Sequence, residues 1–284
     1  MTAADRPWEY SAFPVTVART RRLSPGFLRV TLAGDALRDF APWGLDQRIK
    51  LVLPMPDGST PEFGLLAEPT PHPRDWYARW KALPEGERNV LRTYTPAAIR
   101  PEAGEIDVDL FLHEPPGPAS AWALSCAPGD RLVVTGPDAR MGFTGYGLHY
   151  APPVPPRRVL LVGDESALPA IANILASLGP EVTAEVLLEL ADRADDVLPR
   201  RTGGARVRVV DRAEVAGAAL ERAAHDWGVA DGAAAVADPR FYAWIAGEAA
   251  ASARIRRHLT AELGLPKEQV SFLGYWKLGG PLIG

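Results

Sequence analysis

The sequence has 284 residues, of which 47% are hydrophobic and 23% are charged, so it is long enough and apolar enough for two globular domains. It contains no uninterrupted apolar run close to the roughly 20 residues of a membrane-spanning helix, so no membrane insertion is expected. The formal net charge of −4 argues against a general nucleic-acid-binding protein.

The numbers of cysteines and histidines limit which redox and metal centres the chain can hold. The single cysteine, Cys126, excludes an internal disulfide, an iron–sulfur cluster held by four thiolates and a cysteine-rich zinc site, and it is expected to be a packing residue rather than a redox thiol. The five histidines do not pair at a ligand spacing such as HxxxH, so no metal site is expected and redox chemistry would need an organic cofactor. The N-terminus lacks the basic region and apolar block of a secretory signal, which makes a cytoplasmic location the default expectation.

Short β-like runs separated by turn clusters fill the first half of the chain. The six runs are FPVTVART, FLRVTLAG, RIKLVLP, RTYTPAAI, EIDVDLFLH and DRLVVTGP. This spacing predicts an antiparallel barrel or sandwich over residues 1–150. The segment 151–158, APPVPPRR, has four prolines in its first six residues and is interpreted as a linker.

Strands alternate with helices in residues 159–284. The predicted strands are RRVLLVGD, TAEVLLEL, ARVRVVD and at least one within AAAVADPRFYAWIAGE. The predicted helices are SALPAIANILASLG, AEVAGAALERAAHDW and ASARIRRHLTAELG. This alternation predicts a doubly wound parallel sheet, whose ligands bind beyond the carboxyl ends of the strands.

Two clusters in the first half are candidate sites for a dinucleotide. In Arg92-Thr93-Tyr94-Thr95, the arginine offers a planar two-pronged donor for a pyrophosphate, and Tyr94 lies on the same strand face. The second cluster contains the start of a predicted helix, where free N–H groups favour an anion. Its candidate residues are Asp109, Leu112, His113, Gly117, Pro118, Ala119, Ser120 and Trp122. Taken singly, each cluster is better explained as an ordinary strand or a solvent-capped turn, but two such clusters in one β-domain favour an anion site.

Three clusters in the second half lie at predicted strand ends or near the C-terminus. Asp164, Glu165 and Ser166 join the first strand to its helix, but the glycine-rich dinucleotide fingerprint is absent there, and from these residues alone a plain helix cap is the favoured interpretation. The other candidates are Ala246, Gly247, Glu248, Tyr275, Trp276 and Lys277. For the two aromatic residues, a docking role in the fold is the favoured interpretation, and a place near the flavin or nicotinamide is the alternative.

Five of these blocks occur in one order: RTYT, DVDLFLHEPPGPASAWA, GDESALPAI, AWIAGE with RIRRHL, and GYWKLG. Together they resemble the siderophore-interacting protein family, flavin-dependent ferric-siderophore reductases of the ferredoxin-reductase-like superfamily. The resemblance runs from about Phe13 to Gly279. It implies a six-stranded FAD-binding barrel followed by a nicotinamide-binding α/β domain, with Ser166 where the family usually has threonine.

The resemblance also implies a function and a substrate. NADH or NADPH would reduce FAD, and the flavin would reduce the Fe(III) of a ferric siderophore. Apart from the resemblance, we expect a monomer or weak dimer. Lys50 matches a cationic position that receives the anionic chelate, and Arg254, Arg257 and Lys277 are further candidates. For each of the four, the alternative is a solvent-exposed charge with no role in binding. The alternatives are an electron donor to an oxygenase or to a flavoenzyme of secondary metabolism, and a ferric-chelate-binding protein without turnover.

The choice between NADH and NADPH is expected to depend on residues after the second strand of the nucleotide domain. The GYWKLG ending resembles the branch of the family that favours NADH. Glu189 is near where an acid would hold a ribose, whereas Arg193, Arg200 and Arg201 would suit a 2′-phosphate, so these signals conflict.

Overall fold

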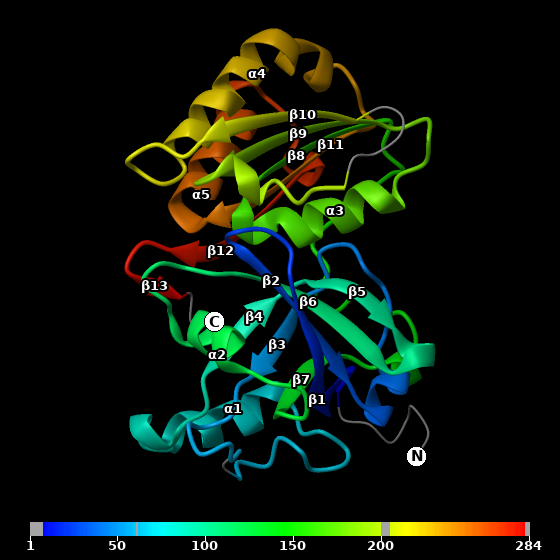
Figure 1. Cartoon of the computed structure of the whole chain (residues 1–284). Helices are drawn as coiled ribbons and strands as arrows, with labels where there is room; N and C mark the ends of the chain where they lie inside the picture. Colours follow the sequence, from blue (N-terminus) through cyan, green and yellow to red (C-terminus); the bar gives the residue numbers. More distant parts are fainter. Residues whose placement is uncertain (1–7, 61, 200–204, 282–284) are drawn as a thin grey trace. The chain divides into compact units, whose positions relative to one another are not determined.

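The computed structural model describes residues 8–60, 62–199 and 205–281. The chain divides into two compact units, residues 1–148 and residues 149–284, which are coloured blue to green and green to red in Figure 1. Arg200 and Arg201, two of the candidates for recognition of a 2′-phosphate, lie outside the described residues. No helix in the described part of the chain is both long and apolar enough to cross a membrane.

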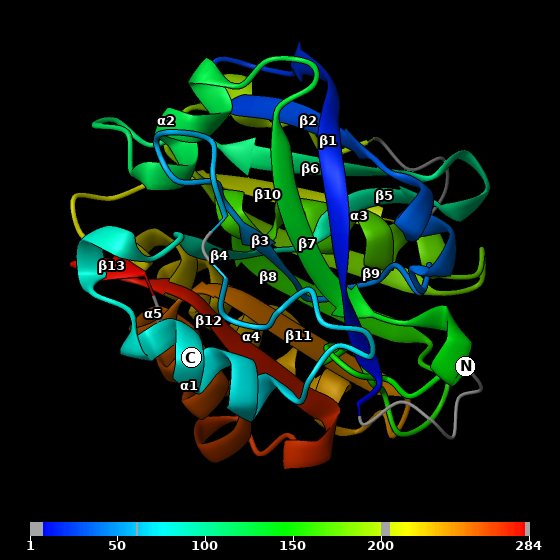
Figure 2. The same cartoon turned by 90° about the horizontal axis from the view of Figure 1, so that it is seen from below.

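The N-terminal unit is built on one antiparallel sheet with the order β4-β3-β7-β1-β2-β6-β5. Its strands are β1 (Tyr10–Arg22), β2 (Phe27–Ala33), β3 (Ile49–Val52), β4 (Leu91–Tyr94), β5 (Pro96–Arg100), β6 (Glu105–Phe111) and β7 (Arg131–Pro137). Figure 2 shows the long strand β1 beside β7, with which it pairs over seven residues. Its helices are α1 (Pro73–Ala82) and α2 (Pro118–Ser125).

The expected antiparallel fold is confirmed, but the sheet has seven strands and not six. The run RTYTPAAI, predicted as one strand, is split into β4 and β5 at Thr95. Pro96 has no N–H to continue a hydrogen-bonded ladder, and the chain changes partner there from β3 to β6. Because β4 and β5 are the two ends of the sheet order and one residue joins them, the sheet must curl until its ends come together.

Alternation along the strands gives this sheet an apolar inner face and a second, smaller apolar cluster outside it. The larger core is built from residues such as Phe13, Leu32, Leu51 and Val134, each at most 1% exposed. Helix α1, which no predicted element covered, buries Trp76 in the smaller cluster.

The C-terminal unit contains a six-stranded sheet with the order β10-β9-β8-β11-β12-β13. Its strands are β8 (Arg158–Asp164), β9 (Thr183–Leu190), β10 (Ala205–Asp211), β11 (Phe241–Glu248), β12 (Val270–Lys277) and β13 (Gly280–Pro281). Its helices are α3 (Leu168–Ser177), α4 (Ala218–Val236), α5 (Ala249–Arg257) and the π-helix His258–Glu262. The first five strands are parallel and β13 is antiparallel, which confirms the expected doubly wound sheet.

Short 3-10 helices connect the larger elements of both units. They are Asp35–Asp39, Glu85–Glu87, Pro101–Ala103, Ala139–Met141, Glu165–Ala167, Arg193–Asp195 and Lys267–Gln269.

Three elements of the C-terminal unit differ from the sequence expectation. Helix α4 begins later and extends further, because Gly217, with φ 80°, provides its N-cap and the alanine-rich segment after it continues the helix to Val236. Helix α5 gives way at His258 to a π-helix. The GYWKLG segment, for which no strand was predicted, contains the end of strand β12 (residues 274–277), which pairs with β11.

The proline-rich segment is bonded to the C-terminal unit. The backbone N–H of Arg157 donates to the carbonyl of Arg240 at 2.9 Å. The Nε of Arg240 donates to the carbonyl of Pro155 at 2.8 Å, and the N–H of Ala151 donates to the Tyr242 hydroxyl. These contacts fix how the chain enters β8.

Candidate functional site

Strand β4 presents its predicted cofactor residues on two faces. Arg92 is opposite Leu51 and Tyr94 is opposite Ile49, so both project on the side of the apolar core. Thr93 is opposite Lys50 on the other face, and the Lys50 ammonium donates to the Thr93 hydroxyl at 3.4 Å. The register therefore brings a candidate cofactor residue and a candidate substrate residue into contact.

Arg92 has the electrostatic properties of an anion-binding residue. Its guanidinium is half-buried, and its Nη1 donates to the carbonyl of Leu91 at 2.9 Å. Within the described residues no carboxylate forms an ion pair with Arg92, and burial lowers the pKa of its guanidinium. Burial also raises the pKa of the neighbouring Tyr94 phenol to about 12, so this phenol is neutral at physiological pH. Burial removes water from the guanidinium, and no carboxylate of the described residues compensates for this loss. Binding an anionic ligand would supply the missing interaction.

Lys50 is also partly buried, with a different consequence. Burial is the main reason that the pKa of its ammonium falls to about 8, and the charge of Arg48 lowers it further. The Lys50 side chain is therefore mostly charged at pH 7 and mostly neutral at pH 9.

The segment between β6 and α2 forms a defined turn. The backbone N–H of His113 donates to the hydroxyl of the buried Ser120 at 3.1 Å, and Leu112 and Trp122 pack against the core. Ala119 is buried beside Ser120, and Pro118 is the first residue of α2. Gly117 is the N-cap and gives no side-chain hydrogen bond to the helix N–H groups.

Gly117 has ordinary extended backbone angles, φ −73° and ψ 172°, so its conformation does not require glycine. A Cβ at this position would meet no atom within 4 Å. An open space in front of uncapped helix N–H groups is a place where a ligand phosphate fits.

Gly117→Ala should leave the fold stable but weaken FAD binding about tenfold, because the added methyl group would occupy space that a close-lying phosphate needs. Fluorescence titration with FAD measures the affinity, and thermal unfolding of the apoprotein measures the fold. Ala121→Ser, at an exposed position of α2, is the matched control. Gly129→Ala would not serve, because Gly129 has φ 98°, a backbone conformation that alanine rarely adopts. Unchanged FAD affinity in Gly117→Ala would contradict a close approach at this residue.

Two predicted residues of this unit have partners within the fold. Asp109 accepts two hydrogen bonds from Arg29, at 2.6 and 2.8 Å, so its carboxylate is occupied in a cross-strand ion pair. Thr95 is buried at the break between β4 and β5. Cys126 is half-buried, packs against the core as expected, and burial raises the pKa of its thiol, which disfavours the reactive thiolate.

Asp164 is the centre of the candidate site in the C-terminal unit. Its Oδ1 accepts from the N–H of Ser166 at 2.9 Å and from the Ser166 hydroxyl at 2.5 Å. Its Oδ2 accepts from the indole Nε1 of Trp276 at 2.8 Å and from the N–H of Glu248 at 3.1 Å. Burial raises the pKa of Asp164, while the bonds from Ser166 and Trp276 act in the opposite direction. Four predicted residues are thus joined at the carboxyl ends of three neighbouring strands, β8, β11 and β12.

Gly247 and Glu248 complete this arrangement at the end of β11. Gly247 has φ 149°, and a Cβ there would lie 2.6 Å from Oδ2 of Asp164, so a side chain would displace that carboxylate. Ala246 is fully buried in β11. The Glu248 carboxylate accepts from the N–H of Ala251 at 2.7 Å and so caps α5.

A second buried acidic network was not predicted from the sequence. Glu165 is 1% exposed, accepts from the N–H of Ala191 at 2.5 Å and forms an ion pair with Arg212. Glu189 is 0% exposed, and its two carboxylate oxygens accept from the N–H groups of Gly217 and Leu220 at the start of α4. Arg212 bonds Glu189 as well. Both oxygens of Glu189 are therefore used in hydrogen bonds within the fold, and neither is available to a ribose at the surface.

The candidate cationic residues have different environments. Arg254, Arg257 and Lys277 are all exposed, and Arg254 forms a two-pronged ion pair with Glu221, at 2.8 and 2.7 Å. Tyr275 is half-buried, with its ring 6.2 Å from that of Trp244. Lys50 belongs to the N-terminal unit and the other three cations to the C-terminal unit.

Within the described residues, the chain has a curled antiparallel sheet whose Arg92 is paired by no carboxylate, followed by a parallel sheet with a polar network at its strand ends, and this two-unit arrangement suits a nucleotide-binding protein. Residues 16–141 match the family model for the siderophore-interacting FAD-binding domain, and residues 156–279 match that for the siderophore-interacting protein. The chain belongs to the siderophore-interacting protein family, as its sequence motifs indicated, and its N-terminal unit is the family's FAD-binding domain.

Relatives differ in how much of their length the chain covers. The NADPH-dependent ferric-chelate reductase of Escherichia coli is 31% identical over 92% of this chain and 91% of that protein. The mycobactin import ATP-binding/permease protein IrtA of Mycolicibacterium smegmatis is 33% identical over 93% of this chain, which spans only 26% of IrtA. A siderophore utilization protein from T. fusca has a crystal structure with a TM-score of 0.75 and 25% identity, covering 98% of this chain and 97% of that one.

Proposed function

We propose that the chain is an FAD-dependent NAD(P)H oxidoreductase that reduces the Fe(III) of a ferric siderophore to Fe(II). The observation that carries this proposal is Arg92, a half-buried guanidinium without a carboxylate partner among the described residues, in a unit that matches an FAD-binding domain. The name of the Escherichia coli relative, a ferric-chelate reductase, supports the choice of acceptor.

The residues of the N-terminal unit fit a flavin dinucleotide. Arg92 would pair with the pyrophosphate, and the N–H groups at the start of α2 would approach it across the open space at Gly117. When bound, FAD accepts the two electrons of a hydride and releases them singly, so that one NAD(P)H reduces two Fe(III) ions. The protein's contribution is positioning, since hydride transfer needs donor and acceptor atoms within roughly 3–3.5 Å.

The C-terminal unit would hold the nicotinamide dinucleotide at the carboxyl ends of its strands. Asp164 would fix the loop after β8, since it receives hydrogen bonds from Ser166, Glu248 and Trp276. We propose NADH as the preferred donor, because Arg193 is already paired with Asp211 at 2.6 Å. A higher kcat/KM with NADPH than with NADH would overturn this preference.

The first test is an absorption spectrum of the purified protein, followed by anaerobic addition of NADH and of NADPH. We expect a flavin spectrum that bleaches and then recovers when a ferric catecholate is added, with Fe(II) trapped by a ferrous chelator. Bleaching without iron reduction would contradict the proposed acceptor, and no flavin after incubation with FAD would contradict the proposal as a whole.

The acceptor site has a pH signature if Lys50 receives the anionic chelate. Because the pKa of Lys50 is lowered to about 8, its positive charge is present below that pH and is lost as the pH rises through it. KM for a ferric catecholate should therefore increase between pH 7 and pH 9 in the wild type. Lys50→Arg, which stays charged, should remove this increase.

Lys81→Arg, at an exposed position on α1, is the matched control and should keep the wild-type pH profile. KM for NADH, measured over the same range, separates an effect on the chelate from a general one. An equal rise of KM in wild type and in Lys50→Arg would assign the pH dependence to the substrate or to another group.

A further inference from the structure

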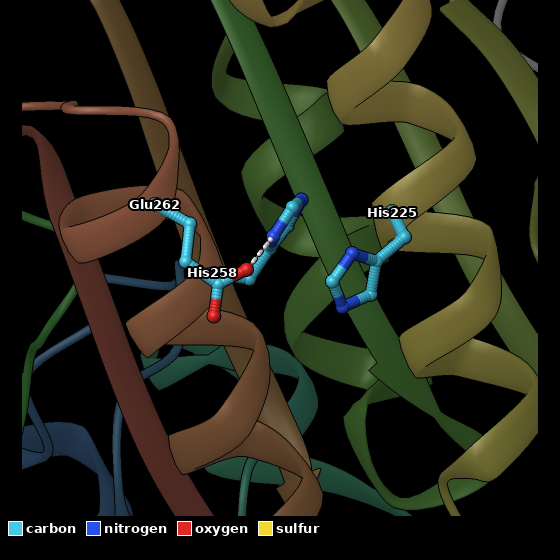
Figure 3. Close-up of side chains that lie close together, drawn as sticks. All are labelled: His225, His258 and Glu262. Carbon is cyan, nitrogen blue, oxygen red and sulfur yellow. Dashed lines mark hydrogen bonds and ion pairs between the residues drawn. The ribbon is translucent and has the colours of Figure 1, made fainter.

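Two helices of the C-terminal unit bring together side chains for which the sequence predicted no metal site. His225 lies on α4, and His258 and Glu262 are the first and last residues of the π-helix that follows α5. Figure 3 shows the three side chains between these helices. The two histidines are 33 positions apart, so a search for closely spaced ligands could not pair them.

The three side chains already have distances close to those of a ligand set. Nδ1 of His258 and Oε2 of Glu262 are 2.8 Å apart, and the two imidazole rings have centroids separated by 3.7 Å. One nitrogen of each histidine and one oxygen of Glu262 all lie within 4.8 Å of one another. Ligand atoms bound at about 2.0–2.2 Å to one Zn²⁺ are separated by roughly 3–3.5 Å, so only a small movement is needed.

The burial of His258 is a second, independent observation. The residue is 7% exposed, and its Nε2 is buried without a hydrogen-bond partner in the described structure. Gly228, one turn after His225, makes room for this ring, since a Cβ there would lie 2.7 Å from Nε2. Because Nδ1 faces Glu262, it is the nitrogen that can share an ion with this carboxylate, and the fit of the Nε2 edge against Gly228 holds the ring in that orientation.

The remaining two side chains can adjust to an ion. His225 and Glu262 are exposed, and the His225 ring can turn about its terminal torsion. The hydrogen bond to His258 lowers the pKa of Glu262 and keeps this carboxylate ionised, as does the nearby charge of Arg257, although the same cation opposes the approach of a metal. Short π-helical segments within α-helices often occur at functional sites.

We propose that His225, His258 and Glu262 bind a divalent first-row transition-metal ion such as Zn²⁺. Two imidazole nitrogens and one carboxylate oxygen suit this class of ion, whereas Mg²⁺ and Ca²⁺ prefer oxygen ligands. Because two of the three side chains are exposed, the remaining coordination positions are open to water. The proposal does not rest on the reductase function, because its ligands are distinct from the residues that would hold FAD or the nicotinamide.

The test uses the whole 284-residue chain with its flavin, freed of metal by a chelator and titrated calorimetrically with Zn²⁺. We expect one ion per chain, and His225→Gln and Glu262→Gln should each weaken binding at least about tenfold. Glu268→Gln, an exposed carboxylate six residues further along, and His72→Asn, a histidine of the N-terminal unit, are the matched controls and should bind as the wild type does. Co²⁺ should give d–d absorption bands in the wild type that are lost in the two test variants.

His258 is buried, so its replacement could unfold the unit, and it is tested without mutation. Long-range ¹H–¹⁵N spectra of the imidazoles should show shifts of the His225 and His258 nitrogens on addition of one equivalent of Zn²⁺. Uptake that is equal in wild type, His225→Gln and Glu262→Gln, or imidazole shifts confined to other histidines, would overturn the proposal. Flavin content measured on the same samples distinguishes this failure from a failure of the proposed function.

Discussion

Replacing Arg92 with alanine should weaken FAD binding by about 100-fold or more. A hydrogen bond to a charged group contributes about 1.5–3 kcal/mol, and a guanidinium can make two such bonds to a pyrophosphate. Arg92→Lys should fall between alanine and wild type, because an ammonium keeps the charge but cannot bind with two parallel N–H groups. The dissociation constant for FAD, from the quenching of flavin fluorescence on binding, is the measurement.

Arg131→Ala is the matched control, since Arg131 is an exposed arginine of β7 in the same sheet. Its FAD affinity should equal that of the wild type. Because the Arg92 guanidinium is half-buried without an ion pair in the described part of the chain, its removal should not lower the melting temperature of the apoprotein. A large loss of apoprotein stability in Arg92→Ala would assign Arg92 a structural role instead.

Asp164→Asn should destabilise the C-terminal unit and slow reduction of the flavin by NADH. The carboxylate accepts from N–H donors on both of its oxygens, at Ser166 on one side and at Glu248 and Trp276 on the other. Whichever way an asparagine amide turns, its NH₂ group faces an N–H donor. An unsatisfied buried donor costs about 1–3 kcal/mol, so denaturant unfolding should show a loss of that size.

Asp226→Asn is the control for Asp164→Asn. Asp226 forms an exposed ion pair with Arg208, and such pairs contribute little to stability. Stopped-flow measurement of flavin bleaching by NADH provides the second readout, and this rate should fall in Asp164→Asn but not in Asp226→Asn. Wild-type stability together with a wild-type bleaching rate in Asp164→Asn would contradict the central position of this carboxylate.

The strands were predictable wherever one hydrophobic pattern typical of a strand continued along the whole segment. TAEVLLEL coincides with β9, and RRVLLVGD contains β8. The run RTYTPAAI was not predictable in the same way, because its strand propensity is continuous while its hydrogen-bond partners change at Pro96. Strand β12 was not predicted, because its aromatic residues are equally typical of a C-terminal segment that docks onto the fold.

The candidate site was predictable in its local motifs and not in its long-range partners. Ser166 bonds Asp164 two positions away, and the sequence placed both in one block. Arg212 lies 47 positions from Glu165 and 23 from Glu189, and no periodic pattern links a charged residue to a partner at such a distance. Conversely, the acid that seemed suited to a ribose, Glu189, is buried by the fold.

The position of Glu189 limits how the nucleotide preference of this protein can be engineered. In many doubly wound domains the acid after the second strand can be exchanged to change the choice between NADH and NADPH. Here its two oxygens hold the first N–H groups of α4, and its charge balances Arg212. Exchange for a neutral or basic residue would uncap a 19-residue helix and leave a partly buried guanidinium with one acid fewer. A redesign of nucleotide preference must therefore start from surface side chains such as Arg193 and leave Glu189 in place.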